Sequence, residues 1–173
     1  MLSRLIPLKN VEAVIEATAQ LIHNKVNVTL EIAGTGPSEP MLRKLVTRLG
    51  LDENVSFLGW RQDVMPLLAS WDLLAMPSVD EGLPIAALQA MAAARPVVAS
   101  RVGGLRELVA DGVTGRLFPS GDVDALASCI ADLAKDRGLL ASMGIAGWQR
   151  AGQKFSAASM AKQTFDVYDR LLR

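Results

Sequence analysis

Two basic residues and one acidic residue lie where a parallel sheet would bring them to a single edge. Arg4 and Lys9 follow the first apolar run of the sequence, and Glu81 follows the fourth. In an open parallel sheet, ligands bind outside the carboxyl ends of the strands, so loops at these positions face the ligand. Two cations favour an anion, and a carboxylate accepts hydrogen bonds from hydroxyl groups. The sequence therefore predicts a ligand site at this edge.

A glycine turn, Gly34-Thr35-Gly36-Pro37, follows the second apolar run and resembles the start of a dinucleotide-binding fingerprint. Glu39 stands where that fingerprint has its third glycine, and two prolines interrupt the helix that should begin there. A dehydrogenase is therefore disfavoured. We expect Gly34 and Gly36 to lie at the ligand edge instead.

The segment from Glu81 to Pro84 leads into a predicted helix in which Pro84 holds the first position, where a missing N–H costs nothing. Free N–H groups and the positive end of the helix dipole would then face the ligand, which favours a phosphate or a sugar hydroxyl. Gln89 follows Glu81 by a little over two helical turns. Both side chains are therefore expected to reach one ligand.

Each of these residues also has a simpler interpretation. Glu81 is alternatively a solvated loop acid, and Arg4 and Lys9 are alternatively surface charges. Trp60 follows the third apolar run, where an aromatic residue either walls a nucleobase or, more commonly, belongs partly to the core. Gln89 is alternatively an ordinary helix residue.

These loops are positioned by alternating strand and helix periodicities. Strands are predicted at Leu2–Ile6, Val28–Ile32, Val55–Leu58, Leu73–Met76, Pro96–Ala99 and Gly115–Phe118. Helices are predicted at Val11–Ile22, Pro40–Leu49, Asp63–Ser70, Pro84–Ala94, Asp122–Lys135 and Leu139–Ala151, and Ser156 caps a last helix. The alternation predicts an α/β fold with a doubly wound, Rossmann-like parallel sheet of about six strands, helices on both faces and a helical C-terminal tail.

The composition is that of one domain covering residues 1–173. Half of the chain is apolar (50%), and 18 Lys and Arg residues balance 18 Asp and Glu residues, so a nucleic-acid partner is not expected. Cys129 is the single cysteine, which excludes an internal disulfide and agrees with a cytoplasmic location. No apolar stretch of the sequence is long enough to predict a membrane span. A doubly wound sheet rarely begins at residue 2, so we expect the chain to be part of a longer protein.

Several segments, in order and spacing, resemble the group 1 (family 4) glycosyltransferases of the GT-B fold. They are Ser3–Asn10, Ala33–Pro37, Val55–Gly59, Pro77–Pro84, Ala90–Ala92, Pro96–Ala99, Val102–Gly104, Gly112, Gly115 and Phe155–Ser156. The resemblance covers nearly the whole chain, but only the C-terminal, donor-binding half of such an enzyme. It implies that an N-terminal domain holding the acceptor site is absent here.

The resemblance also implies roles for individual residues. Arg4 and Lys9 match the basic pair that neutralises the donor diphosphate, and Glu81 matches the glutamate that contacts the transferred sugar. Gln89 departs from the family, which usually has a second glutamate there to hold the ribose hydroxyls. The implied catalytic residues are Glu81, Arg4 and Lys9, and the implied donor-binding residues are Gly34, Gly36, Trp60, Gly82, Leu83, Pro84, Ile85 and Gln89. Ser3 and Ala94 replace glycines that are common in the family.

The implied reaction is retaining transfer of a hexose from a UDP-linked or GDP-linked donor, with no cofactor and no required metal. The acceptor would be a saccharide or a lipid-linked glycan, and the full-length protein could lie at the inner membrane surface. The isolated domain is expected to be inactive. Two alternatives stay open: a non-catalytic nucleotide-binding or scaffold module, for which Gln89 would mark lost activity, and, more distantly, a nucleotide-sugar epimerase of the same fold.

Overall fold

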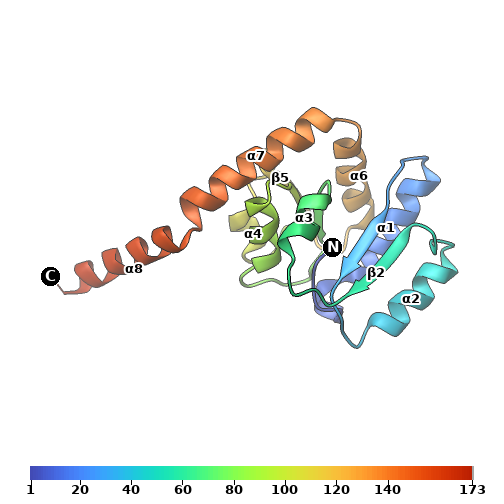
Figure 1. Cartoon of the computed structure of the whole chain (residues 1–173), viewed down its shortest axis with the longest axis horizontal. Coiled ribbons are helices and arrows are strands. Elements are labelled where there is room, and N and C mark those ends of the chain that lie inside the picture. The colour runs from blue at the N-terminus through green and yellow to red at the C-terminus, as the bar shows by residue number, and fades with distance from the viewer. Residues whose placement is uncertain (173) are drawn as a thin grey trace.

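The computed structural model describes residues 1–172, and its helices and strands alternate as predicted (Figure 1). The strands are β1 (Leu30–Ala33), β2 (Val55–Gly59), β3 (Leu74–Met76), β4 (Val97–Ser100) and β5 (Gly115–Phe118). The helices are η1 (Pro7–Lys9, a 3-10 turn), α1 (Val11–His23), α2 (Glu39–Arg48), α3 (Met65–Ser70), α4 (Ile85–Ala92), α5 (Leu105–Leu108), α6 (Val123–Ala134), α7 (Arg137–Lys154) and α8 (Ala157–Leu171). The predicted α/β class is confirmed, and α5 and η1 were not predicted.

All strand pairs are parallel, and they form a two-stranded sheet of β1 and β2 and a three-stranded sheet in the order β3-β4-β5. Each parallel pair is joined through a helical crossover, which is the connection that parallel strands require. The carboxyl ends of β1, β2 and β3 therefore carry three of the loops that the sequence marked for ligand binding.

The prediction of about six strands was wrong by one, because Leu2–Ile6 is not a strand. Leu2 makes a single parallel bridge with Ala33. The N–H groups of Ser3 and Leu5 donate to the carbonyls of Ala33 and Thr35, both at 3.0 Å. Within residues 1–172 this segment forms no backbone hydrogen bond to β3, so it pairs on one side only.

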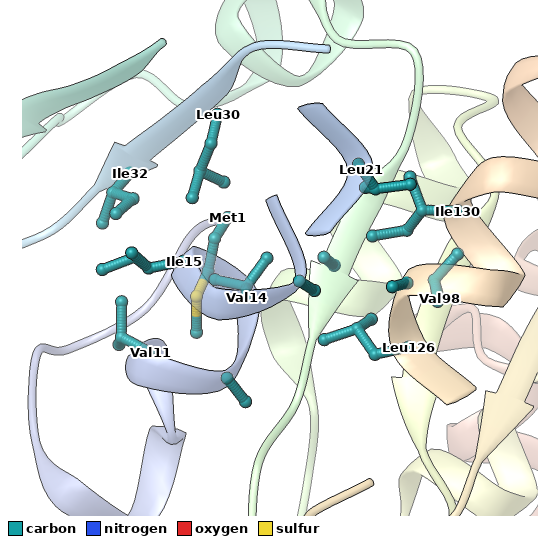
Figure 2. Close-up of a cluster of buried hydrophobic side chains, with 14 of the residues drawn as sticks. Met1, Val11, Val14, Ile15, Leu21, Leu30, Ile32, Val98, Leu126 and Ile130 are labelled. Atoms are coloured by element: carbon teal, nitrogen blue, oxygen red, sulfur yellow. The ribbon is translucent and has the colours of Figure 1, made fainter. Parts of the chain in front are cut away.

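The first core cluster packs β1 against α1 and α6 (Figure 2). Ile15 and Ile32 are completely buried, and Leu126 of α6 reaches the same cluster together with Val98 of β4. Strand side chains alternate between faces, so Leu74, Met76, Val97 and Ala99 pack instead into a second cluster with α4 and α5. Both faces of the three-stranded sheet are thus covered, as expected for buried parallel strands.

The C-terminal third is helical, as predicted, and its helices begin at capping side chains. The carboxylates of Asp122 and Asp136 accept hydrogen bonds from backbone N–H groups at the starts of α6 and α7. Ser156 Oγ accepts from the N–H of Ser159 at 3.2 Å and so caps α8, as the sequence predicted. α8 extends away from the rest of the molecule and has no buried residue (Figure 1). Within residues 1–172, no helix is both long and apolar enough to cross a membrane.

Candidate functional site

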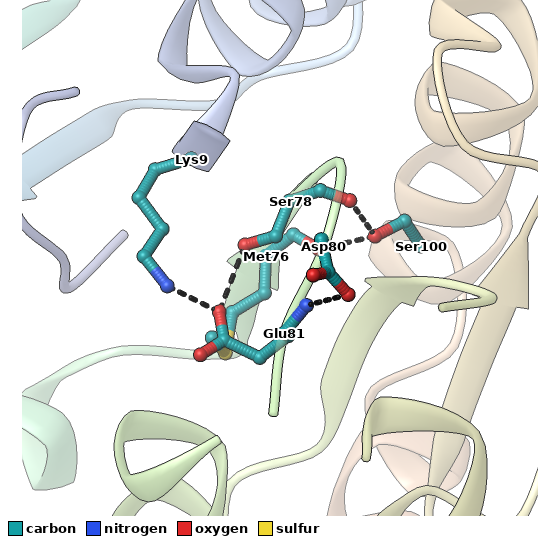
Figure 3. Close-up of polar contacts among 6 residues, drawn as sticks. All are labelled: Lys9, Met76, Ser78, Asp80, Glu81 and Ser100. Carbon is teal, nitrogen blue, oxygen red and sulfur yellow. Dashed lines mark hydrogen bonds and ion pairs between the residues drawn. The ribbon is translucent and has the colours of Figure 1, made fainter. Parts of the chain in front are cut away.

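Lys9 and Glu81 meet at the carboxyl edge although they are 72 residues apart in sequence (Figure 3). Pro7 begins the 3-10 turn η1, which ends at Lys9 and directs its side chain toward the loop after β3. The N–H of Val79 in that loop donates to the carbonyl of Leu8 at 2.9 Å. This backbone bond and the Lys9–Glu81 ion pair tie the first loop of the chain to the fourth.

Glu81 is held by almost all of its polar groups. Its Oε2 atom accepts from Lys9 Nζ at 2.5 Å and from Ser78 Oγ at 3.1 Å. Its N–H donates to Asp80 Oδ1 at 2.9 Å, and its carbonyl accepts from the N–H of Gly104 at 2.8 Å. Of the polar atoms of Glu81, only Oε1 has no hydrogen-bond partner within residues 1–172. That oxygen is available to accept a hydrogen bond from a ligand.

A second, fully buried hydroxyl supports this arrangement from below. Ser100, at the end of β4, donates from Oγ to the carbonyl of Ser78 at 2.5 Å. Ser78 is itself completely buried and directs its own hydroxyl to Glu81 (Figure 3). The hydrogen bonds therefore run from the buried end of β4 through Ser78 to the carboxylate of Glu81. A buried donor that is fully paired in this way fixes the orientation of its acceptor.

Two glycines let the loop after β4 approach Glu81 closely. A Cβ atom on Gly103 would lie 2.0 Å from the carbonyl oxygen of Glu81, and one on Gly104 would lie 2.1 Å from that of Gly82. Gly103 also has a positive φ of 38°, which side chains disfavour. The position of Glu81 therefore depends on a loop that follows a different strand.

Arg4 lies on the same edge, on a segment held by the glycine turn after β1. A Cβ atom on Gly34 would meet the carbonyl oxygen of Ser3 at 1.8 Å, and one on Gly36 would meet that of Leu5 at 2.3 Å. These glycines thus place the backbone on either side of Arg4. The Arg4 side chain is exposed and makes no ion pair or side-chain hydrogen bond within residues 1–172.

Trp60 follows β2 and is 69% exposed, so the interpretation of this residue as partial core was wrong. The carbonyl of the preceding Gly59 accepts from the N–H of Gly34 at 2.8 Å, which ties this loop to the glycine turn. Gly59 has a positive φ of 68°, and this conformation ends β2 sharply and turns Trp60 into solvent. Contact of Trp60 with a nucleobase stays a prediction.

The helix after Glu81 begins one residue later than predicted, because Pro84 is its N-cap and Ile85 its first residue. Pro84 is buried, whereas Leu83 and Ile85 are exposed beside it and Gly82 has open space around its Cα. No side chain caps α4. The N–H of Ile85 donates to the carbonyl of Leu83 at 2.9 Å, and binding of an anion at this helix start stays a prediction.

The spacing of Gln89 from Glu81 was counted in helical turns, but residues 81–84 are not helical, so the spacing does not fix their relative position. Gln89 lies on α4, is half-buried and makes no side-chain hydrogen bond within residues 1–172. Its contact with a ribose therefore stays a prediction that rests on the resemblance alone.

Sequence reasoning assigned no role to Ser78, Ser100, Gly103 or Gly104. Gly103 and Gly104 could have been found from the rule that ligands bind at the loops that follow parallel strands. That rule was applied to the loops after four apolar runs and not to the loop after Pro96–Ala99, where Gly103 and Gly104 lie. The hydroxyl of Ser78 gave no signal, because burial of a single serine beside a carboxylate depends on the packing of β3 against β4.

The candidate edge does not coincide with a hollow found elsewhere in the molecule. A hollow of about 410 Å³ lies near the amino ends of β1 and β3, lined by residues that include Met1, Leu30, Glu31, Trp71 and Leu73. None of the predicted site residues lines it. Residues 1–172 also contain no group of three or more His, Cys, Asp or Glu side chains placed to hold a metal.

Parallel strands and covering helices place this chain in the doubly wound α/β class, and its charged loops lie at the carboxyl ends of the strands, where such folds bind ligands. The family model of the glycosyl transferases group 1 matches residues 1–136. The chain therefore belongs to the group 1 glycosyltransferase family, which confirms the family and fold that the sequence motifs predicted.

Relatives and solved structures agree with this assignment. The chain is 39% identical over 155 residues to the GDP-mannose-dependent alpha-(1-6)-phosphatidylinositol monomannoside mannosyltransferase of Mycolicibacterium smegmatis, covering 84% of this chain and 41% of that protein. It superposes on HepE from Anabaena, crystallised in complex with UDP, with a TM-score of 0.89 and 32% identity over 98% of this chain and 47% of that one.

A third comparison concerns the fold alone. The C-terminal domain of a glycosyl transferase group 1 family protein (LpcC) from Francisella tularensis superposes with a TM-score of 0.81 and 23% identity, over 90% of this chain and 85% of that domain. The present chain thus matches nearly all of a C-terminal domain, but less than half of the mannosyltransferase and of HepE.

Proposed function

We propose that this chain is the donor-binding half of a retaining glycosyltransferase that uses a UDP-linked or GDP-linked hexose. The observation that carries the proposal is the Lys9–Glu81 ion pair at the carboxyl edge, which also carries the exposed cation Arg4. Cations suit a diphosphate, and a carboxylate with one free oxygen suits a sugar hydroxyl. Relatives in the same family bind UDP or are named as dependent on GDP-mannose, which supports both donors.

Each residue has a defined task in this proposal. Arg4 and Lys9 neutralise the charge that develops on the diphosphate as it leaves, and the uncapped start of α4 adds its dipole. Glu81 positions the sugar through Oε1, because Oε2 is already bound. The exposed Trp60 packs on the nucleobase, and Gln89 hydrogen-bonds the ribose. Gly34 and Gly36 shape the wall beside Arg4.

The rest of the active site belongs to a part of the protein that this chain does not include. The chain covers 41% and 47% of two relatives, so a second domain is proposed to face the open edge and to bind a saccharide or lipid-linked acceptor. We propose that the full-length protein works in the cytoplasm or at the inner membrane surface. We also propose that transfer needs no cofactor and no metal, and that the isolated chain is inactive.

A non-catalytic nucleotide-binding module is the second candidate. The observation that favours it is Gln89, which stands where the family usually has a glutamate and is without a side-chain partner in residues 1–172. A glutamine still donates and accepts hydrogen bonds, so binding without transfer is the distinguishing behaviour. A full-length protein that binds donor sugar but transfers nothing would favour this candidate.

Calorimetric titration of the purified chain with UDP, GDP, ADP and their hexose conjugates tests the donor site. Binding to UDP or GDP is expected, and Arg4→Ala and Lys9→Met should each weaken it about tenfold or more, since each removes a charge-assisted phosphate contact. Arg48→Ala and Lys44→Met are matched controls, because both residues are exposed on α2. Binding lost equally in the controls, or absent from the wild-type chain, would overturn the proposal.

A further inference from the structure

Lys9 is already neutralised before any ligand arrives. Its Nζ atom lies 2.5 Å from Glu81 Oε2, and the two side chains are only 20% and 11% exposed. Arg4, the second cation assigned to the diphosphate, is exposed and without an ion pair in residues 1–172. The two cations assigned to the diphosphate are therefore in different electrostatic states.

The position of Glu81 in this pair is imposed by the fold. Ser78 donates to the same oxygen, and the backbone of Glu81 is fixed at both ends by Asp80 and Gly104. A carboxylate held in this way cannot easily swing aside when an anion approaches Lys9. Like charges a few ångströms apart repel strongly where solvent is partly excluded.

We propose that Glu81 competes with the ligand's phosphates for Lys9, so that the site discriminates between a diphosphate that carries a sugar and a free one. This inference rests on the proposed donor site and assigns Glu81 a role in selectivity in addition to sugar contact. A free nucleoside diphosphate meets the repulsion of Glu81 and gains nothing in return. A sugar-linked diphosphate meets the same repulsion, but its hydroxyl groups donate to the free Oε1 atom.

A consequence concerns the end of the reaction cycle. After the sugar leaves, the nucleoside diphosphate no longer provides a hydroxyl donor to Glu81. The carboxylate then acts only as a competitor for Lys9 and weakens the hold on the spent nucleotide. The same residue thus stabilises the bound donor and favours release of the product, because its two oxygens face different partners.

The test compares the affinities of UDP and GDP, and of their hexose conjugates, for wild-type chain, Glu81→Gln and Glu53→Gln. Glu53 is an exposed acid at the amino end of β2, and its substitution changes the net charge by the same amount. Glu81→Gln should bind the free nucleotide about tenfold more tightly than wild type, while the advantage of the hexose conjugate over the free nucleotide falls about tenfold or more. Glu53→Gln should change neither.

Three results would overturn the inference while the donor site stands. They are weaker or unchanged binding of the free nucleotide by Glu81→Gln, equal tightening by Glu53→Gln, and unchanged tightening by Glu81→Gln when Lys9→Met is also present. If Lys9→Met abolishes binding, the difference in nucleotide affinity between Glu81→Gln and Glu53→Gln still tests the inference. Glu81→Ala repeats the measurement if the glutamine variant melts at a lower temperature. A wild-type chain that binds no nucleotide would instead overturn the proposed function, and this inference with it.

Discussion

The loops at the carboxyl edge and the helix α8 lie on the surface of the same molecule, but they are held in opposite ways. The edge loops are fixed by close backbone contacts and by buried hydroxyls under Glu81. α8 has no buried residue, although Met160, Phe165, Tyr168 and Leu171 give it a large apolar surface. Order in the first region comes from tertiary contacts, whereas order in the second rests on helix propensity and the Ser156 cap.

The difference shows where each region depends on the rest of the protein. The edge loops have a defined shape in this chain alone, as expected of a site that is pre-organised for a ligand. An isolated helix of 15 residues is marginal in water, and large exposed apolar surfaces usually mark a contact site. The edge loops therefore take their shape from contacts within this chain, whereas the apolar face of α8 has no packing partner within residues 1–172.

The largest expected effect comes from substituting a glycine of the edge loops, which tests whether close backbone contacts hold these loops. Gly34→Ala should destabilise the protein by about 3 kcal/mol, because the added Cβ meets a backbone carbonyl and φ is unfavourable for alanine. In the wild type that carbonyl belongs to Ser3, at 1.8 Å from the Cβ position, and φ is +133°. Urea unfolding measures the free energy directly.

Gly59→Ala is the matched control for Gly34→Ala. Gly59 also has a positive φ of 68°, but an added Cβ there has nothing within 4 Å. Only the cost of placing alanine at a positive φ remains, so this variant should lower the free energy of unfolding by about 1 kcal/mol. Equal losses in the two variants would show that the contact with Ser3 adjusts freely and that the edge is not rigidly held.

A smaller effect is expected at Asp111, which ties the loop before β5 to Arg101 and to the backbone of Leu117. Burial opposes ionisation of this carboxyl, but the hydrogen bond from the Leu117 N–H and the nearby Arg101 outweigh it and lower its pKa. A lowered folded pKa means that the ionised form adds stability above the ordinary pKa and that this stability is lost as the pH falls below it.

Asp111→Asn should therefore destabilise the protein by about 1 kcal/mol at about pH 7 and by less at about pH 3, since the side chains are well exposed and solvent screens the pair. Chemical unfolding of both proteins at the two pH values measures the difference. A loss that is the same at both pH values would indicate that shape, and not ionisation, matters at Asp111.

The sequence predicted those features that depend on local periodicity. Helices α1, α6 and α8 begin within a residue of their predicted starts, because apolar spacing and the caps Asp122 and Ser156 are local signals. The five parallel strands were also predicted. Leu2–Ile6 was not distinguishable from a strand, because its missing partner on the β3 side is a property of the assembled sheet.

Sequence position predicted which candidate residues lie at the strand ends, but not how these residues contact one another. Position after a strand identified Arg4, Lys9 and Glu81 as candidates, because loops at the carboxyl ends of parallel strands face the ligand. The hydroxyl of Ser78 and the shared oxygen of Glu81 were not predicted, because they depend on contacts between loops far apart in sequence. The exposure of Trp60 was not predicted for a different reason, because it depends on the positive φ of the adjacent Gly59, which the sequence does not specify.

The smallest effect on stability is expected from removing α8. Deletion of residues 157–173 should change the free energy of unfolding of the remaining domain by less than about 0.5 kcal/mol, because α8 contributes nothing to either core. Leu126→Ala is the contrasting variant. Leu126 is fully buried, so this substitution should lower the free energy of unfolding by about 3 kcal/mol.

Hydrogen exchange and sedimentation complete the test of α8. Its amides should exchange far faster than those of α6, and the intact chain should self-associate more with concentration than the shortened one, because the apolar face is removed with the helix. Protected α8 amides in a monomeric chain, or a large loss of stability on deletion, would mean that α8 packs against residues 1–156. The contrast between a self-sufficient edge and a dependent helix would then be wrong.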